Sequence, residues 1–344
     1  MGSREPEGFS HRVRKLGSHH PWCDLRAAPT GGNDAGCGAR GLGAGTGRDR
    51  RGAAVHGCVG GCSGGGGGGG GEGEASTPTA AADEVVAEAG EVTCSDITYT
   101  PASASGAQLG TLCTPSVVTS DTTVLLVHGG DGYQDSRADL AAWQEVYADA
   151  GVPTLAIDYT LTGDRGEAAI YPLAEQNVKA AVEYLRLVGA DLGTDRVVVQ
   201  GHSAGARLGA IVLTTPDDPS FAGPELRAGV SDAIDGFIGF YGYYGGDQFE
   251  AEAYYGSASL QAADAVTNAG RATGPTVLVH GIDDGFVPVQ HSRRLAEALQ
   301  AAGPGGELDL VADAGHGFDG YAQAELTEAG RRSADHLLAW LSRH

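Results

Sequence analysis

The stretch VVVQGHSAG, residues 197–205, decides how this chain folds. Its valines predict a buried strand, and the small and apolar residues at 204–213 predict a helix directly after it. Between strand and helix lies the pattern G-x-S-x-G, in which Gly201 and Gly205 permit a very tight turn. A turn of this kind lifts the hydroxyl of Ser203 out of the fold, where it can reach a substrate carbonyl.

The same pattern occurs a second time as GCSGG, residues 61–65. That copy lies in a glycine run with no strand before it and no helix after it, so it cannot build such a turn. In a chain with 57 glycines the pattern alone is weak evidence, and a tight turn with a bystander serine is the alternative interpretation. The strand and helix around 201–205 favour a nucleophilic Ser203.

An earlier apolar run, VLLVHGGD at residues 124–131, also ends in small residues. The loop after it would bring backbone N–H groups beside the serine, as the negatively charged transition state of acyl transfer requires. We expect this oxyanion hole to use the N–H groups of Ala204, Gly130 and Asp131, with Gly129 as an alternative donor.

A serine nucleophile needs a base, and the base needs an acid to orient it. The chain offers both after Ser203, each past the end of a predicted strand. VLVHGIDDGFVP, residues 277–288, ends in a turn with two aspartates, and LDLVADAGHGF, residues 308–318, ends in a loop with His316. Of the eleven histidines, His316 is the strongest candidate for the base, the alternative being a solvent-exposed loop histidine.

Strand-like runs alternate with helix-like segments from residue 93 onward, which predicts an α/β domain over 93–344. Its mostly parallel, eight-stranded sheet would have helices on both faces, with the first two strands forming an antiparallel hairpin. Cys94 and Cys113 lie in these two strands and could form a disulfide in an oxidising compartment, or remain unpaired. The predicted strands are 96–99, 109–113, 123–128, 153–158, 196–200, 234–240, 276–280 and 307–312. The clearest predicted helices are 172–189, 289–303 and 321–342.

Residues 1–92 are expected to be a disordered, glycine-rich tail and linker, because they cannot bury enough apolar surface to fold. Within them, VGGCS at 59–63 and the glycine run after it resemble the lipobox and tether of a bacterial lipoprotein. The residues before Cys62 contain no apolar run of signal-peptide length, so we hypothesise a different natural start or an upstream frame shift. The expected location is extracytoplasmic, secreted or lipid-anchored at Cys62.

The net charge of −22 disfavours binding to nucleic acid or to an anionic membrane surface. No C-x-x-C or H-E-x-x-H pattern occurs, so metal binding has little support, and acyl transfer through a serine calls for no other cofactor. The expected partner is a small-molecule ester, and the sequence does not predict an oligomeric state.

Several motifs, taken in order, resemble those of α/β-hydrolase carboxylesterases, above all the feruloyl/acetylxylan-esterase-like and hormone-sensitive-lipase-like branches. The resemblance covers about residues 94–344. Its motifs are His128-Gly129-Gly130, Asp158-Tyr159-x-Leu161, Tyr171-Pro172, Gly201-His202-Ser203-Ala204-Gly205, His280-Gly281-x2-Asp284-x2-Val287-Pro288 and Gly315-His316-Gly317.

The resemblance implies an α/β-hydrolase fold and hydrolysis of short-to-medium acyl esters through an acyl-serine intermediate. It implies a triad of Ser203, Asp284 and His316, which leaves Asp283 as a turn or capping residue. Cleavage of amides, as by an arylformamidase or a serine peptidase, is the alternative activity. A non-catalytic binding module is a third interpretation and would fit a broken triad better than an intact one.

Two departures from the hormone-sensitive-lipase pattern favour a minimally capped enzyme. Asp131 stands where that branch has a third glycine, and the tail shows no helical cap. The sizeable insertion near the site, residues 241–274, contains five tyrosines that could form an aromatic rim for a substrate or pack against the core. The rim residues expected from this segment are Tyr241, Tyr243 and Tyr244.

Overall fold

The computed structural model describes residues 11–14, 91–162, 171–245 and 263–344, and all of them belong to one compact unit. A second unit, residues 19–86, lies outside the described residues, as do Cys62, the second G-x-S-x-G and most of the expected tail. No helix in the described part of the chain is long and apolar enough to cross a membrane.

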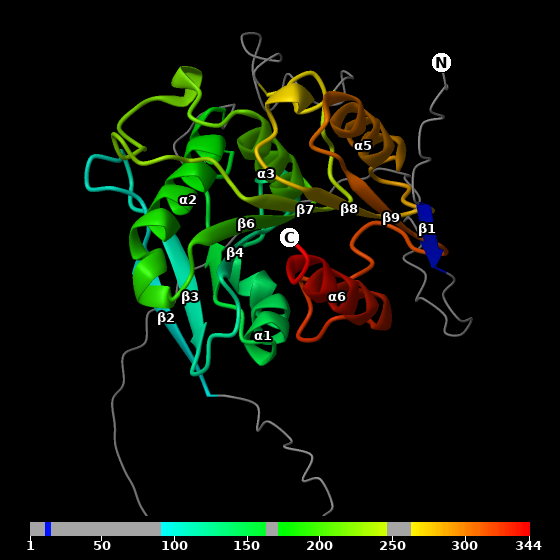
Figure 1. Cartoon of the computed structure of the whole chain (residues 1–344), viewed down its shortest axis with the longest axis horizontal. Helices are drawn as coiled ribbons and strands as arrows, with labels where there is room; N and C mark the ends of the chain where they lie inside the picture. Colours follow the sequence, from blue (N-terminus) through cyan, green and yellow to red (C-terminus); the bar gives the residue numbers. More distant parts are fainter. Residues whose placement is uncertain (1–10, 15–90, 163–170, 246–262) are drawn as a thin grey trace, which may run out of the picture. The chain divides into compact units, whose positions relative to one another are not determined.

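A nine-stranded sheet forms the centre of the described unit, in the order β1-β9-β8-β7-β6-β4-β5-β3-β2 (Figure 1). Across the sheet from β9 to β5, including β4, every neighbouring pair of strands is parallel. In contrast, β3 is antiparallel to both β2 and β5. The strands are β1 His11–Arg14, β2 Val92–Thr98, β3 Leu109–Pro115, β4 Thr122–Val127, β5 Thr154–Ile157, β6 Arg196–His202, β7 Gly236–Phe240, β8 Thr276–Gly281 and β9 Glu307–Val311.

The eight predicted strands correspond to β2 through β9, and the predicted hairpin is β2 and β3. The structure adds β1, a four-residue strand within the expected tail that pairs in parallel with β9. A strand this short is held by backbone hydrogen bonds and needs no apolar run, so the sequence pattern gave no signal for it.

Helices cover both faces of the sheet, as Figure 1 shows, with α2, α3 and α5 on one face and α1 and α6 on the other. Each layer encloses its own cluster of buried apolar residues. The central strands β4 and β8 are buried along their whole length, as expected for parallel strands covered on both sides. The helices are α1 Ala141–Asp149, α2 Leu173–Leu192, α3 Ala204–Thr214, α5 Gln290–Ala302 and α6 Glu328–Leu341.

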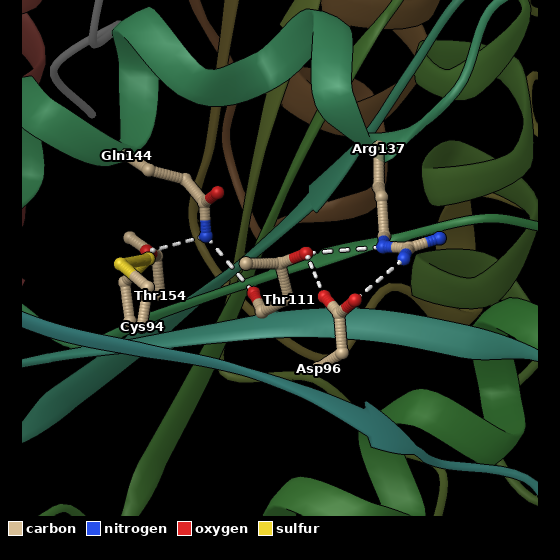
Figure 2. The surroundings of a disulfide bond; sticks show 7 residues. Cys94, Asp96, Thr111, Arg137, Gln144 and Thr154 are labelled. Atoms are coloured by element: carbon tan, nitrogen blue, oxygen red, sulfur yellow. Dashed lines mark hydrogen bonds and ion pairs between the residues drawn. A yellow bond between two sulfur atoms is a disulfide. The ribbon is translucent and has the colours of Figure 1, made fainter. Parts of the chain in front are cut away.

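A disulfide links Cys94 on β2 to Cys113 on β3, where the two residues face each other across the hairpin. The next pair on the same face is Asp96 and Thr111. Arg137 donates hydrogen bonds to Thr111 at 3.0 Å and to Asp96 at 3.2 Å (Figure 2). Arg137 begins the short 3-10 helix η2, Arg137–Leu140. These bonds therefore connect the disulfide-bonded hairpin to the segment that follows β4.

Candidate active site

Ser203 stands at the turn between β6 and α3 in a backbone conformation that few non-glycine residues adopt, with φ 52° and ψ −113°. Two glycines permit this turn. A Cβ atom on Gly201 would lie 2.3 Å from the carbonyl oxygen of Gly205, and one on Gly205 would lie 2.3 Å from the carbonyl oxygen of Val127. Backbone approaches this close exclude any side chain, so the two glycines of the motif are steric requirements of the turn.

Three predicted residues come together above this turn, in hydrogen-bonding order. His316 Nε2 lies 2.9 Å from Ser203 Oγ, and His316 Nδ1 lies 2.8 Å from Asp284 Oδ2. Ser203 follows β6, Asp284 lies beyond the end of β8, and His316 lies on the loop after β9, as the strand pattern predicted. The neighbouring Asp283 is exposed, so the structure favours Asp284 as the partner of the histidine.

Four donors surround the buried Asp284 carboxylate. The backbone N–H groups of Phe286 and Val287 donate to Oδ1 at 2.9 and 2.8 Å, and His280 Nε2 lies 3.3 Å from Oδ2, beside the bond from His316. Burial alone would raise the pKa of Asp284, but the hydrogen bonds from His280, His316 and Val287 outweigh it and lower that pKa below its usual value. Asp284 is therefore an anion at neutral pH and can stabilise a positive charge on His316.

Among the described residues, two aromatic rings of opposite exposure contact the His316 ring. Tyr241 is fully buried and meets His316 edge-on, with 4.7 Å between ring centroids. Phe286 is 55% exposed and lies 5.1 Å from the His316 centroid. The His316 side chain itself is 24% exposed, so a substrate in solvent can reach it.

The loop predicted to complete an oxyanion hole does lie against the nucleophile. A Cβ on Gly129 would be 3.3 Å from Ser203 Cβ, and Gly130 and Asp131 follow in the 3-10 turn η1, Gly130–Gly132. Ala204 is the first residue of α3, where a backbone N–H has no acceptor within its own helix. The positive end of the α3 dipole therefore also faces the space above Ser203.

Tyr159 fixes the orientation of this loop, a role that the sequence did not reveal. Its buried hydroxyl donates to the Gly129 carbonyl at 2.8 Å, and His128 Nδ1 lies 3.1 Å from the same oxygen. In a trans peptide the C=O and the following N–H point in opposite directions, so the N–H of Gly130 points away from Tyr159 and His128. The Asp158-Tyr159 motif does not indicate this contact, because sequence spacing says nothing of it.

A second carboxylate–histidine pair lies next to the nucleophile, and no sequence motif indicates it. Asp319 and His202 are both fully buried, with 3.2 Å between Asp319 Oδ2 and His202 Nδ1. Asp319 also accepts hydrogen bonds from Trp143 Nε1 at 3.0 Å and from the hydroxyl of Tyr241. Burial would raise the pKa of Asp319, yet His202 and these donors lower it overall. The four residues are far apart in sequence, so no motif connects them.

The expected aromatic rim is wrong for two of its three tyrosines. Tyr241 and Tyr244 are buried among core residues, with exposed fractions of 0% and 1%. The physical reason is that β7 ends directly before Tyr241, whose φ of 37° turns its side chain into the core beside Asp319. Tyr243 is half-buried, with its ring centroid 4.5 Å from that of His291. Tyr254 and Tyr255, from the same insertion, lie outside the described residues.

Several solved structures similar to this chain are named as esterases or ester hydrolases. Thermogutta terrifontis esterase 2 phosphoramylated by tabun matches with 22% identity and a TM-score of 0.63, over 73% of this chain and 94% of that one. The acetyl ester-xyloside bifunctional hydrolase from Caldicellulosiruptor lactoaceticus matches with 20% identity and a TM-score of 0.60, over 72% and 96%. A truncated carbohydrate esterase from gut microbiota matches with 17% identity and a TM-score of 0.61, over 73% and 97%.

These similarities confirm the predicted α/β-hydrolase fold. No curated protein sequence matches the chain. Residues 140–344, more than half of the sequence and including Ser203, Asp284 and His316, match the Prolyl oligopeptidase family. By this match and by its fold, the chain belongs to the prolyl oligopeptidase family of α/β-hydrolases.

Proposed function

We propose that this protein is a serine hydrolase that cleaves carboxylic esters of short-to-medium acyl chains through an acyl-enzyme intermediate. The observation that carries the proposal is the unbroken chain of hydrogen bonds from Ser203 Oγ through His316 to Asp284, with distances of 2.9 and 2.8 Å. Serine is a weak nucleophile by itself, and this arrangement supplies both a base and an acid that orients it.

In the proposed mechanism, His316 Nε2 takes the Ser203 proton as Oγ attacks the ester carbonyl. Asp284 stabilises the imidazolium, and the N–H groups of Ala204, Gly130 and Asp131 bind the developing oxyanion. His316 then passes its proton to the departing alcohol oxygen, which leaves an acyl group on Ser203. Water, deprotonated by the same histidine, attacks that acyl group and releases the acid.

The names of the similar structures support ester chemistry and suggest a reagent. One describes Thermogutta terrifontis esterase 2 phosphorylated by paraoxon, at 22% identity and a TM-score of 0.61. Organophosphates of this kind phosphorylate an activated serine hydroxyl and expel a leaving group. Paraoxon therefore probes whether Ser203 is activated, independently of which ester is the substrate.

The family match favours amide cleavage as a second candidate, because the matched family is named for an oligopeptidase. The same three residues could transfer an acyl group from either an ester or an amide. A series of p-nitrophenyl esters and the p-nitroanilides of the same acids separates the two activities. Ester hydrolysis predicts turnover of acetyl to octanoyl esters and far slower cleavage of the matching anilides.

The test of the site uses the chain's own second copy of the motif as a control. Ser203→Ala should lower kcat for p-nitrophenyl acetate by roughly 10⁴-fold or more and abolish labelling by paraoxon. Ser63→Ala removes the serine of the other G-x-S-x-G and should change neither result. Parental turnover by the Ser203→Ala variant would refute the assignment.

We also propose that the protein works outside the cytoplasm. The disulfide between Cys94 and Cys113 supports this, since such bonds persist in oxidising compartments. A lipid anchor at Cys62 remains a proposal about residues outside the described part of the chain. Labelling of the source bacterium with a radioactive fatty acid should mark the protein made from its own gene with its natural start, and should not mark a Cys62→Ala variant made in the same way.

A further inference from the structure

Phe286 places an aromatic ring on the solvent side of the proposed catalytic histidine. Its side chain is 55% exposed, and its ring centroid lies 5.1 Å from that of His316. Single exposed apolar residues are common on protein surfaces and need no explanation by themselves. Phe286 differs because it touches the residue that must hand a proton to the substrate, whereas Tyr241, which also contacts His316 in the described part of the chain, is buried.

The backbone at Phe286 is fixed by the same carboxylate that orients His316. Asp284 Oδ1 accepts the N–H of Phe286 at 2.9 Å and that of Val287 at 2.8 Å, while Oδ2 binds His316. One buried carboxylate therefore sets the position of both the imidazole and the peptide that carries the exposed ring. This shared anchor fixes the backbone that carries the ring beside His316.

The chemistry of acylation determines which part of an ester would meet this ring. The carbonyl oxygen must point to the N–H of Ala204, at the start of α3. The alcohol oxygen must lie within hydrogen-bonding distance of His316 Nε2, because that atom protonates it as the C–O bond breaks. The alcohol part of the ester is therefore held on the His316 side, where Phe286 lies.

We propose that Phe286 forms a wall of the alcohol subsite and selects esters whose alcohol carries an aromatic ring. The inference rests on the proposed ester hydrolysis and extends it to a substrate class. A flat aromatic group can stack against the exposed Phe286 face in an offset arrangement, whereas a small alkyl alcohol gains little from it. The acyl group leaves the site only after the alcohol has gone, so Phe286 acts mainly on acylation.

The first test compares two acetates that form the same acyl-enzyme, benzyl acetate and methyl acetate. Phe286→Ala should lower the ratio of their kcat/KM values by about fivefold, whereas Phe286→Tyr, which keeps a ring, should retain it. Leu187→Ala is the matched control, since Leu187 is 57% exposed on α2 and should leave the ratio unchanged. Equal ratios in the parent and in Phe286→Ala would overturn the proposal.

The second test measures partitioning of the acetyl-enzyme between two added alcohols. An acceptor alcohol enters the subsite that the leaving alcohol vacates, so Phe286→Ala should lower the yield of benzyl acetate relative to methyl acetate when both alcohols compete. This product ratio does not depend on how much variant protein is folded. A shift in preference between acetyl and benzoyl methyl esters, without a change in the alcohol ratio, would place Phe286 in the acyl subsite and overturn the proposal.

The two proposals fail in different ways. If the parent protein hydrolyses neither acetate, or if Ser203→Ala does so equally well, the proposed function is wrong. If hydrolysis depends on Ser203 while both alcohol ratios are unaffected by Phe286→Ala, only the alcohol subsite is wrong.

Discussion

Among the described residues, two carboxylate–histidine pairs lie close to Ser203, and their surroundings differ. The first, here called the upper pair, is Asp284 and His316, and the His316 side chain is 24% exposed. The second, here called the lower pair, is Asp319 and His202, and both are fully buried. The second ring nitrogen of His316 faces Ser203 Oγ, whereas that of His202 lies 3.1 Å from the side-chain amide nitrogen of Gln200.

The comparison shows that a histidine beside a carboxylate is not by itself a catalytic base. The base needs a free second nitrogen directed at a nucleophile and an approach for substrate, which His316 has. Both neighbours of His202 Nδ1, Asp319 and Tyr241, can accept a hydrogen bond, and its Nε2 can accept one from Gln200. We infer that the upper pair performs chemistry and that the lower pair supports the turn.

The largest expected effect comes from a substitution that breaks the upper pair. His316→Ala should lower kcat for a short p-nitrophenyl ester by roughly 10⁴-fold or more, because Ser203 loses its base. Thermal unfolding should change little, since the His316 side chain is partly exposed. Asp283→Asn is the control, an exposed position next to Asp284 that should retain parental activity. Activity within tenfold of the parent in His316→Ala would contradict the assignment.

Breaking the lower pair should affect stability more than chemistry. Asp319→Asn leaves Trp143, Tyr241 and His202 with a neutral partner in a fully buried site. We expect a loss of about 3 kcal/mol in the free energy of unfolding, measured by urea denaturation, because a buried charge network loses one member. kcat per folded molecule should fall less than tenfold. A 10³-fold fall in kcat without loss of stability would assign Asp319 a chemical role.

Lowering the pH should reduce the stability that both pairs contribute to the fold, because protonation of their aspartates is linked to unfolding. The pKa values of Asp284 and Asp319 are lowered in the folded protein, so the unfolded chain binds protons more readily than the native one as pH falls below about 4. The stability from these groups is present above that pH and is lost as pH decreases through the folded-state pKa values. The free energy of unfolding should therefore decrease from pH 5 to pH 3, and it should do so by about 1 kcal/mol less in Asp319→Asn.

The smallest expected effect concerns Tyr241, the residue that connects the two pairs. Tyr241→Phe retains the ring against His316 but removes the hydroxyl that donates to Asp319. We expect a loss of about 1 to 2 kcal/mol in the free energy of unfolding, with kcat within threefold of the parent. Stopped-flow assays and denaturation on the same preparation measure both. A larger loss of kcat would show that the lower pair acts on His316 through this tyrosine.

The upper pair was predictable from the sequence, whereas the lower pair was not. Ser203, Asp284 and His316 each follow an apolar strand, and parallel strands bring their carboxyl ends to one edge of the sheet. Asp319 and His202 meet only because the loop after β9 folds back over β6 and β7. Their partners come from α1 and from the residue after β7, so the contact depends on three-dimensional packing that no spacing encodes.

The tyrosines after β7 illustrate the same limit. Composition alone allowed a rim or a core position for Tyr241 and Tyr244, and the backbone turn at Tyr241 decides for the core. Phe286, in contrast, gives no signal in the sequence because it is one apolar residue in a turn. Its importance follows from its contact with His316, which depends on how Asp284 organises the turn.

The loop after β9 holds the histidine of the upper pair and the aspartate of the lower pair only three positions apart. Transplanting this loop into another hydrolase scaffold would therefore require the partners of Asp319 to be transferred as well. These partners are Trp143, His202 and Tyr241. A one-residue insertion between His316 and Asp319 would prevent the two residues from reaching their partners at the same time. Directed evolution of this protein should accordingly tolerate changes in loop composition here far better than changes in loop length.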